Sequence, residues 1–255
     1  MIIEQRQSLL QDLLAQQGMS NLDSLAAELG VSQSTIRRDI EALVERGLAR
    51  RTHGGVIWTG DRNTPTRPYA FDQRLGDQVD AKRLIARAAA NLVQPGQTIL
   101  IDGGTTTYYL AEALVGRPLQ IVTNSLPIAQ LFLNDENVEL ILTGGLLYPR
   151  YGVLLGPTSE SMLASIHAQM LFFSVAGIHD ASLYNQNLLL VQAERRMMEQ
   201  AQNVILLADY GKFGHQALVR LCGLDQIDVV VSDPQLDERH REAIKSAGCE
   251  LVSSS

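Results

Sequence analysis

The first 45 residues contain three stretches in which apolar side chains recur at the three-to-four spacing of a helix with one buried face. The apolar positions of the first two stretches are Ile2, Ile3, Leu9, Leu10, Leu13 and Leu14, then Leu22, Leu25, Ala26 and Leu29. Gly18 and Gly30 end these helices, and Ser20 and Asp23 have the spacing of a capping box. In the third stretch Ile36, Ile40, Leu43 and Val44 share one arc, and Ser32 is placed to cap the helix. The pattern predicts two short helices joined by a tight turn, with another helix before them.

Polar residues of the third stretch face away from its apolar arc or lie on its flanks. They are Ser34, Thr35, Arg37 and Arg38. Glu41 and Glu45 share the outward side further along, where carboxylates would repel phosphate, so only the first half of this helix suits a DNA groove. Entry of the first turns of a second helix into the major groove is how a helix-turn-helix docks.

The segment "LARRTHGGVIW", residues 48–58, predicts two short strands around a turn at Gly54 and Gly55, with Arg50, Arg51 and His53 near its tip. A solvated helix face and a plain hairpin are the alternative interpretation of these arginines. We favour DNA binding, because the helix pair, the polar first turn and the basic hairpin follow one another directly.

The overall charge restricts how DNA could be bound. The 255-residue chain carries a formal charge of −7, which argues against general coating of nucleic acid. Residues 1–58 hold six arginines against seven acidic residues. Specificity must therefore depend on where the arginines are placed.

After residue 58 the pattern changes twice. Residues 59–76 lose periodicity and contain Pro65 and Pro68, as expected for a linker between a winged helix-turn-helix domain at 1–58 and a second domain at 77–255. From there an apolar helix at 81–93 leads into short apolar runs that alternate with helical ones. The runs start at residues 98, 120, 138, 170, 203 and 227, with a weaker seventh at 249. This alternation predicts an α/β domain with a mostly parallel sheet.

Glycine and polar residues follow the predicted strands. The candidate ligand-binding residues at these ends are Asp102, Gly103, Gly104, Thr105, Thr106, Thr107, Asn124, Ser125, Gly144, Gly145, Asp209 and Lys212. In open α/β sheets ligands bind outside the carboxyl ends of the strands, so these residues at the strand tips predict one ligand-binding crevice.

The run "DGGTTT" at 102–107 has the features of an anion site, because glycines expose backbone amides and a helix follows. Taken alone, it is a structural turn about as often. It lacks the glycine spacing of a dinucleotide fold and the lysine of a P-loop, which favours a small phosphorylated ligand over a nucleotide. Lys212 and Arg150 are candidate cations for it, and a solvent-exposed role is the alternative for both.

The remaining chemistry of the sequence points to few other classes. Cys222 and Cys249 form no ligand pair, and His53, His167, His179, His215 and His240 are scattered, so we expect no metal and no cofactor. No apolar run approaches the length of a membrane span. We expect a cytoplasmic protein without membrane partners.

The run "VSQSTIRRDIEALVERG" followed by "RTHGG" resembles the DeoR (GlpR) family of bacterial transcriptional regulators. The resemblance extends over "AKRLIARAAANLVQPGQTILIDGGTTT", "IVTNS", "LTGG", "AGI" and "KFG", and so covers nearly the whole chain. It implies operator contacts by Ser32, Gln33, Ser34, Thr35, Arg37, Arg38, Arg51 and His53. It also implies a sensor domain similar to ribose-5-phosphate isomerase that binds a phosphorylated sugar.

Two segments depart from the family pattern. Asp209-Tyr210-Gly211-Lys212 stands where the family has an aspartate-histidine-serine-lysine run. Ser182, Leu183 and Tyr184 replace a glycine-leucine-threonine start, and Leu190 replaces an acidic residue.

From these observations we expect a repressor of a carbohydrate-metabolism operon that binds double-stranded operator DNA, responds to a phosphorylated sugar and forms at least a dimer. The alternative is a sugar-phosphate isomerase with an accessory DNA-binding domain. The isomerases that resemble this fold place clustered acids after the strand that here ends "AGIHDAS", and this chain offers only Asp180 there. A metal or redox sensor is a third class, but no ligand cluster supports it.

Overall fold

The computed structural model describes residues 6–7, 9–11, 13–14, 19–45, 48–52, 55–58 and 71–254. The chain divides into two compact units, residues 1–70 and 71–255. Each unit has its own hydrophobic core.

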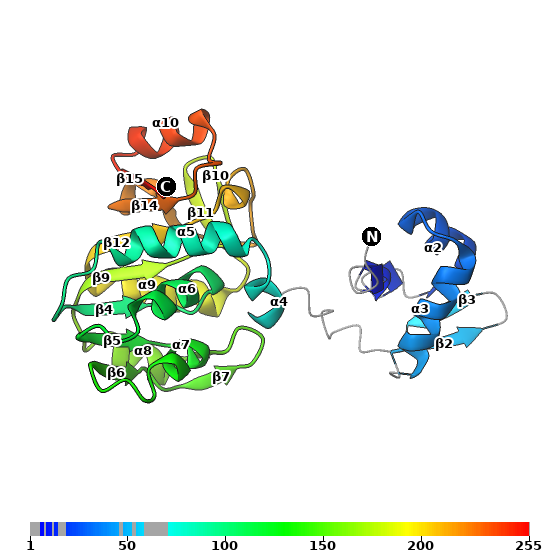
Figure 1. The fold of residues 1–255 in the computed structure, drawn as a ribbon, viewed down its shortest axis with the longest axis horizontal. Helices are drawn as coiled ribbons and strands as arrows, with labels where there is room; N and C mark the ends of the chain where they lie inside the picture. Colours follow the sequence, from blue (N-terminus) through cyan, green and yellow to red (C-terminus); the bar gives the residue numbers. More distant parts are fainter. Residues whose placement is uncertain are drawn as a thin grey trace. The chain divides into compact units, whose positions relative to one another are not determined.

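The first unit is a small helical domain with an antiparallel sheet (Figure 1). Residues 6–7, 9–11 and 13–14 are helical, and α2 (Leu22–Leu29) and α3 (Gln33–Glu45) follow. The predicted hairpin is confirmed as β2 (Ala49–Thr52) and β3 (Gly55–Trp58), paired from Ala49–Trp58 to Thr52–Gly55. A strand that the sequence did not indicate, β1 (Met19–Ser20), pairs with β3. A Cβ atom at position 55 would overlap the backbone oxygen of Ser20, so this pairing requires a glycine there.

The core of the first unit lies where the helical pattern predicted it, with three corrections. Leu10, Leu14, Leu25, Ile36, Ile40 and Leu43 are buried. Leu9 and Val44, which were assigned to the buried faces, are 46% and 37% exposed. Each is the immediate neighbour of a buried leucine, about 100° away around the helix, and falls outside the buried arc.

The third correction concerns the cap of α2. Its N-cap is Asn21, whose side chain accepts a hydrogen bond from Ser24 N at 2.7 Å, and not the predicted Ser20. Ser20 belongs to β1, where it pairs with Val56, so the chain turns into the helix one residue later. Gly30 ends α2 with φ +63°, as predicted.

The second unit is built on a seven-stranded parallel sheet with the order β15-β14-β12-β9-β4-β5-β6 (Figure 1). Its strands are β4 (Thr98–Ile101), β5 (Leu119–Thr123), β6 (Val138–Leu142), β9 (Ala168–Phe173), β12 (Ala201–Leu207), β14 (Val229–Ser232) and β15 (Glu250–Ser253). All six predicted strands and the weaker seventh are confirmed in this sheet. The α/β class is therefore confirmed.

Helices cover both faces of this sheet. On one face lie α5 (Val79–Ala90), α6 (Thr105–Leu114) and α7 (Leu126–Leu131); on the other lie α8 (Pro157–Leu163), α9 (Leu188–Glu199) and α10 (Glu238–Ser246) (Figure 1). Successive strand residues alternate between the two cores. Ile99 and Ile101 pack with α5 and α6, and Leu100 packs with α9.

Short elements outside the main sheet were not predicted. They are the hairpin β7 (Leu146–Tyr148) and β8 (Val153–Leu155), the antiparallel sheet of β10 (Gly177–His179), β11 (Ser182–Asn185) and β13 (Val219–Gly223), and the 3₁₀ helices η1 (Tyr210–Lys212) and η2 (Leu224–Gln226).

Within the stretch expected as linker, residues 71–75 form α4 (Phe71–Leu75). The Phe71 ring packs edge-on against Tyr108, and Tyr109 Oη donates to Leu75 O at 3.1 Å. α4 is thus fixed to α6. Among the described residues, no helix is both long and apolar enough to cross a bilayer.

Candidate functional site

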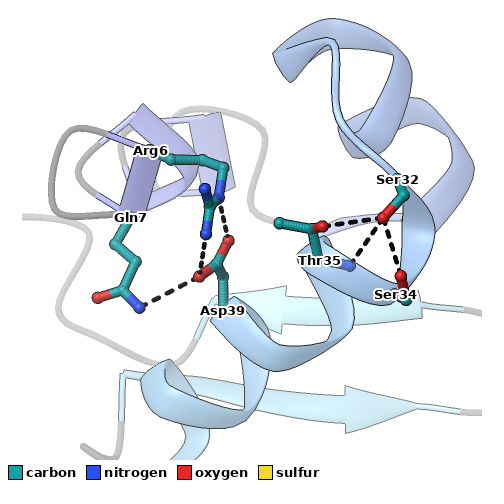
Figure 2. A network of polar contacts seen from close by, with 6 residues as sticks. All are labelled: Arg6, Gln7, Ser32, Ser34, Thr35 and Asp39. Carbon is teal, nitrogen blue, oxygen red and sulfur yellow. Dashed lines mark hydrogen bonds and ion pairs between the residues drawn. The ribbon is translucent and has the colours of Figure 1, made fainter. Parts of the chain in front are cut away.

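A cluster of hydroxyl groups lies at the start of α3. Ser32 Oγ accepts a hydrogen bond from Thr35 N at 3.2 Å, which confirms the predicted cap (Figure 2). The same oxygen lies 2.8 Å from both Ser34 Oγ and Thr35 Oγ1. Ser32 and Ser34 are exposed. The first turn of α3 therefore presents hydroxyl and backbone donors to solvent, which is the chemistry that binds phosphate.

Arg37 and Arg38 follow this cluster on the exposed side of α3. Within the described part of the chain, neither guanidinium has a hydrogen bond or an ion pair. Both cations are thus available to an anionic partner.

Two other predicted DNA contacts are engaged within the protein. Gln33 Nε2 donates to Asp23 Oδ1, which links α3 to α2. Arg51 Nη2 donates to Glu41 Oε1 at 2.9 Å and to Arg37 O at 3.1 Å, which links the wing to α3. His53 lies outside the described residues.

Asp39, next to the paired arginines, is a structural residue that the sequence analysis missed. It is 2% exposed, and its carboxylate accepts from Arg6 Nε at 2.6 Å, from Arg6 Nη2 at 3.2 Å and from Gln7 Nε2 at 3.2 Å (Figure 2). The spacing held a signal for this, since position 39 lies three residues after Ile36 and four before Leu43, on the buried arc. The interaction fixes the first helical residues against α3.

In the second unit, hydrogen bonds join the tips of β4 and β5. Asn124 Nδ2 donates to Asp102 Oδ1 at 3.1 Å, and Asn124 Oδ1 accepts from Gly103 N at 3.1 Å. Both side chains are buried, and burial raises the pKa of Asp102 above its usual value. A Cβ atom at position 103 would overlap the Val153 side chain, so the approach of the β8 hairpin requires a glycine.

The threonine run opens α6. Gly104 is the N-cap and supplies no side-chain hydrogen bond to the first amides of the helix. Thr105, Thr106 and Thr107 are buried, and Thr107 Oγ1 donates to Gly104 O at 2.9 Å. The hydroxyl of Thr107 is therefore engaged by the turn itself.

The other predicted tips have local structural roles. Ser125 Oγ caps α7 by accepting from Ile128 N at 3.4 Å. Gly144 and Gly145 adopt φ +70° and +114° in the turn between β6 and β7, beside Thr158 and Leu155 respectively.

A group of cations lies near Asp209 and Lys212. Asp209 is buried and caps η1 by accepting from Gly211 N at 3.0 Å, which places Lys212 at the end of that turn. Lys82 of α5 is 4% exposed, and its Nζ donates to Arg74 O. Burial lowers the pKa of Lys82, the positive charge of Lys212 adds to this effect, and the negative charge of Asp209 opposes it; the net pKa is about 8.

Arg74 of α4 completes this group. Its Nε and Nη2 atoms are buried and have no hydrogen-bond partner among the described residues. Its guanidinium lies 5.0 Å from the centre of the Tyr151 ring. Burial lowers the pKa of Arg74, while the electrostatic influence of Tyr151 and Asp102 opposes that shift. Buried guanidinium groups are ordinarily paired, so this one points to an anionic ligand.

Lys82 and Arg74 were missed by the sequence analysis. Lys82 belongs to a predicted helix that contains both apolar and charged residues, and a lysine in such a helix normally faces solvent. Arg74 belongs to a stretch of the sequence without periodicity.

The comparison with protein families decides between the candidate classes. The model described as "DeoR-like helix-turn-helix domain" matches residues 6–60, and the model described as "DeoR C terminal sensor domain" matches residues 77–234. The chain belongs to the DeoR family.

Curated relatives of this DeoR-family chain match over nearly its full length. The HTH-type transcriptional regulator GlpR of Haloferax volcanii is 33% identical over 99% of this chain and 98% of its own. The HTH-type transcriptional repressor CsqR of Escherichia coli K12 is 35% identical over 94% of this chain and 91% of its own. The L-fucose operon activator of Haemophilus influenzae is 33% identical over 91% of this chain and 93% of its own.

Solved structures are similar at a lower level. Ribose 5-phosphate isomerase A of Methanocaldococcus jannaschii is 16% identical with a TM-score of 0.40, covering 54% of this chain and 55% of that one. An eIF2B beta structure from Chaetomium thermophilum is 18% identical with a TM-score of 0.42, covering 60% of this chain and 48% of that one.

The DeoR-family protein is thus a helix-turn-helix DNA-binding transcriptional regulator with a C-terminal sensor domain, and not an enzyme. Asp180, the acid considered for catalysis, lies in the β10–β11 turn with its side chain 88% exposed and paired with His179. Within the described residues, no group of three or more His, Cys, Asp or Glu side chains could hold a metal ion.

Proposed function

We propose that this regulator represses a carbohydrate-metabolism operon and that a phosphorylated sugar, bound at the tips of the parallel sheet, changes its affinity for the operator. The observation that carries the effector part of the proposal is the buried guanidinium of Arg74, which has two unsatisfied nitrogens beside the strand ends.

The first turns of α3 are the proposed DNA-reading surface. Ser32, Ser34 and Thr35 would bind backbone phosphates, and Arg37 and Arg38 would reach phosphates or base edges. Arg51 and Gln33 would act mainly by holding the wing and α2 against α3, because both are engaged there. His53 is retained as a proposed contact of the wing tip.

Arg74, Lys82 and Lys212 would bind the anionic group of the effector. Lys82 lies within electrostatic reach of both Lys212 and Arg74, and their repulsion adds to the effect of burial in lowering its pKa. A bound phosphate would relieve that repulsion. Asp102 and Asn124 would bind hydroxyl groups, and the amides at the start of α6 would contribute further donors.

The names of the relatives support a carbohydrate operon as the target. They include a putative aga operon transcriptional repressor of Escherichia coli O157:H7 and the L-fucose operon activator. Because these names include both directions of control, our choice of repression remains a proposal. Control would follow from linkage: a ligand that prefers one state of the sensor changes operator affinity by its ratio of affinities for the two states.

A dimer or larger homo-oligomer is also proposed. A single winged helix reads one half-site, and a second copy would set the half-site spacing.

The DNA-binding part predicts a loss of binding in the double variant Arg37→Ala plus Arg38→Ala. Each lost base contact should cost about 1–3 kcal/mol. Each lost phosphate contact should flatten the plot of log affinity against log salt concentration by about 0.9. Fluorescence anisotropy with DNA from upstream of the gene would measure both. The control is Arg196→Ala on α9; equal binding by the double variant and this control would contradict the proposed surface.

The effector part predicts that phosphate and phosphorylated sugars raise the melting temperature of the second unit. A ligand at ~100 times its dissociation constant adds roughly 2.7 kcal/mol of stability. Lys212→Met and Arg74→Met should abolish most of the shift. Lys245→Met, at an exposed lysine of α10, is the control and should keep it. No shift in the wild-type protein with any of these anions would contradict the anion site.

A further inference from the structure

Glu194 is a buried carboxyl group that neither the DNA-binding surface nor the cation group explains. It lies in α9 and is 1% exposed. Asn185 of β11 donates to its Oε1 atom. Its second oxygen, Oε2, is buried and has no hydrogen-bond partner among the described residues. Buried polar atoms in folded proteins are nearly always paired, so this oxygen requires a partner that the described part of the chain does not supply.

Glu194 is related to the end of β4 through Asp102. Leu100 of β4 packs in the same core as Val191 of α9, and Asp102 follows the end of β4, where its backbone N–H donates to Phe172 O at 3.0 Å. Burial raises the pKa of Glu194 well above its usual value, and the negative charge of Asp102 raises it further. Asp102 and Glu194 therefore lie within electrostatic reach of each other. Asp102 is also within electrostatic reach of Arg74.

The charged residues near these strand ends fall into two chemically different groups. Arg74, Lys82 and Lys212 are cations, whereas Asp102 and Glu194 are acids with acceptor oxygens. A ligand that satisfies both groups carries an anion at one end and a hydrogen-bond donor at the other.

We infer that Oε2 of Glu194 accepts a hydrogen bond from the effector, and that the effector carries a donor, a hydroxyl or an ammonium group, at the end remote from its anion. The inference rests on the proposed function, since it takes the strand-end crevice as the effector site. It makes Glu194 a residue that distinguishes a phosphorylated sugar or amino sugar from a bare anion.

The substitution Glu194→Gln separates this role from a purely structural one. A bound donor favours the ionised carboxylate, in which both oxygens accept. A glutamine keeps the size of the side chain and an oxygen that accepts from Asn185, but it replaces the second acceptor oxygen of that carboxylate with an amide donor. A structural role through Asn185 is therefore preserved, while acceptance of a ligand hydrogen bond is lost. Glu199→Gln, at an exposed carboxylate of the same helix, is the matched control.

The test is calorimetric titration of the full-length protein with inorganic phosphate, glucose 6-phosphate, glucosamine 6-phosphate and ribose 5-phosphate. The wild-type protein should bind at least one phosphorylated sugar more tightly than phosphate. Glu194→Gln should lower the affinity for that sugar by about tenfold to a hundredfold and leave the affinity for phosphate unchanged. A preference of the wild-type protein for glucosamine 6-phosphate over glucose 6-phosphate would assign the donor as ammonium, and the reverse preference as hydroxyl.

Equal sugar binding by Glu194→Gln and the wild-type protein would overturn the inference. Binding of phosphate with no gain from any sugar would overturn it as well, while leaving the proposed anion site intact. Binding of none of the four probes would overturn both. Should Glu194→Gln fail to fold, Glu194→Asp retains the acid and withdraws it by one methylene; unchanged sugar affinity in that variant would equally overturn the inference.

Discussion

The role of each charged residue in this protein depends on its interaction partners more than on its exposure to solvent. Arg37 and Arg38 were predicted as outward-facing from the helical pattern alone, and they are. The partners of Arg51, Asp39 and Arg74 could not be predicted, because each depends on a residue or ring brought near by tertiary structure. A periodic pattern shows which side of a helix is buried, and it does not show which charge lies there.

Lys82 provides a prediction about pH. Its pKa of about 8 lies below the usual value of 10.5, so its charge is lost as the pH rises through about 8. Anion binding to a protonated lysine should therefore weaken between pH 7 and pH 10. By the same linkage, bound phosphate should raise the pKa of Lys82.

Phosphate titrations across this pH range would measure the effect, with Lys82→Met compared with the wild-type protein. The variant should bind phosphate more weakly at pH 7 and show a flatter pH profile. Lys245→Met serves as the control for a surface lysine. Parallel profiles for wild type and Lys82→Met would show that Lys82 does not contact the anion.

At the scale of elements, parallel strands were predicted better than hairpins. Strands buried on both faces are continuous apolar runs, and all seven were visible in the sequence. The hairpin β7–β8 contains Leu146 and Leu147, which are exposed and do not alternate with polar residues. β1 is only two residues long and depends on Gly55 in another strand. Such elements are fixed by their neighbours, so their own sequences carry little signal.

The contact between the wing and α3 gives a second prediction. Glu41 holds Arg51 and places a carboxylate near the proposed DNA surface. Glu41→Gln should weaken the interaction that holds Arg51, because a neutral amide replaces the carboxylate, and it removes a charge that repels phosphate, so non-specific DNA affinity should rise. If Arg51 gains a phosphate contact, the plot of log affinity against log salt concentration should steepen by about 0.9.

Anisotropy measurements on an unrelated duplex at several salt concentrations would test this. Glu45→Gln removes the same charge from α3 without releasing Arg51, and it is therefore the matched control. A slope for Glu41→Gln equal to that for Glu45→Gln would show that Arg51 makes no new phosphate contact.

At the scale of the whole molecule, the two units have separate cores. The first core contains Ile40 and Leu43, and none of its residues belongs to the two cores of the second unit. The two-unit organisation agrees with the two family models that match the chain, whose matched ranges do not overlap.

Separate cores predict separate unfolding transitions in calorimetry. Ile40→Ala should destabilise the first unit by about 2–5 kcal/mol, because it leaves a cavity in a small core. Its transition should move to lower temperature, while the transition of the second unit stays in place. A single transition that moves as a whole would contradict independent unfolding.

The last feature of this organisation is the attachment of α4 to the second unit. Phe71 and Leu75 fasten it to α6, the helix that starts at the threonine loop, and Arg74 lies between these two anchors. α4 is therefore the first helix of the second unit, and the buried charge of Arg74 lies within it. If the proposed effector neutralises this guanidinium, it acts on the segment with which the second unit begins.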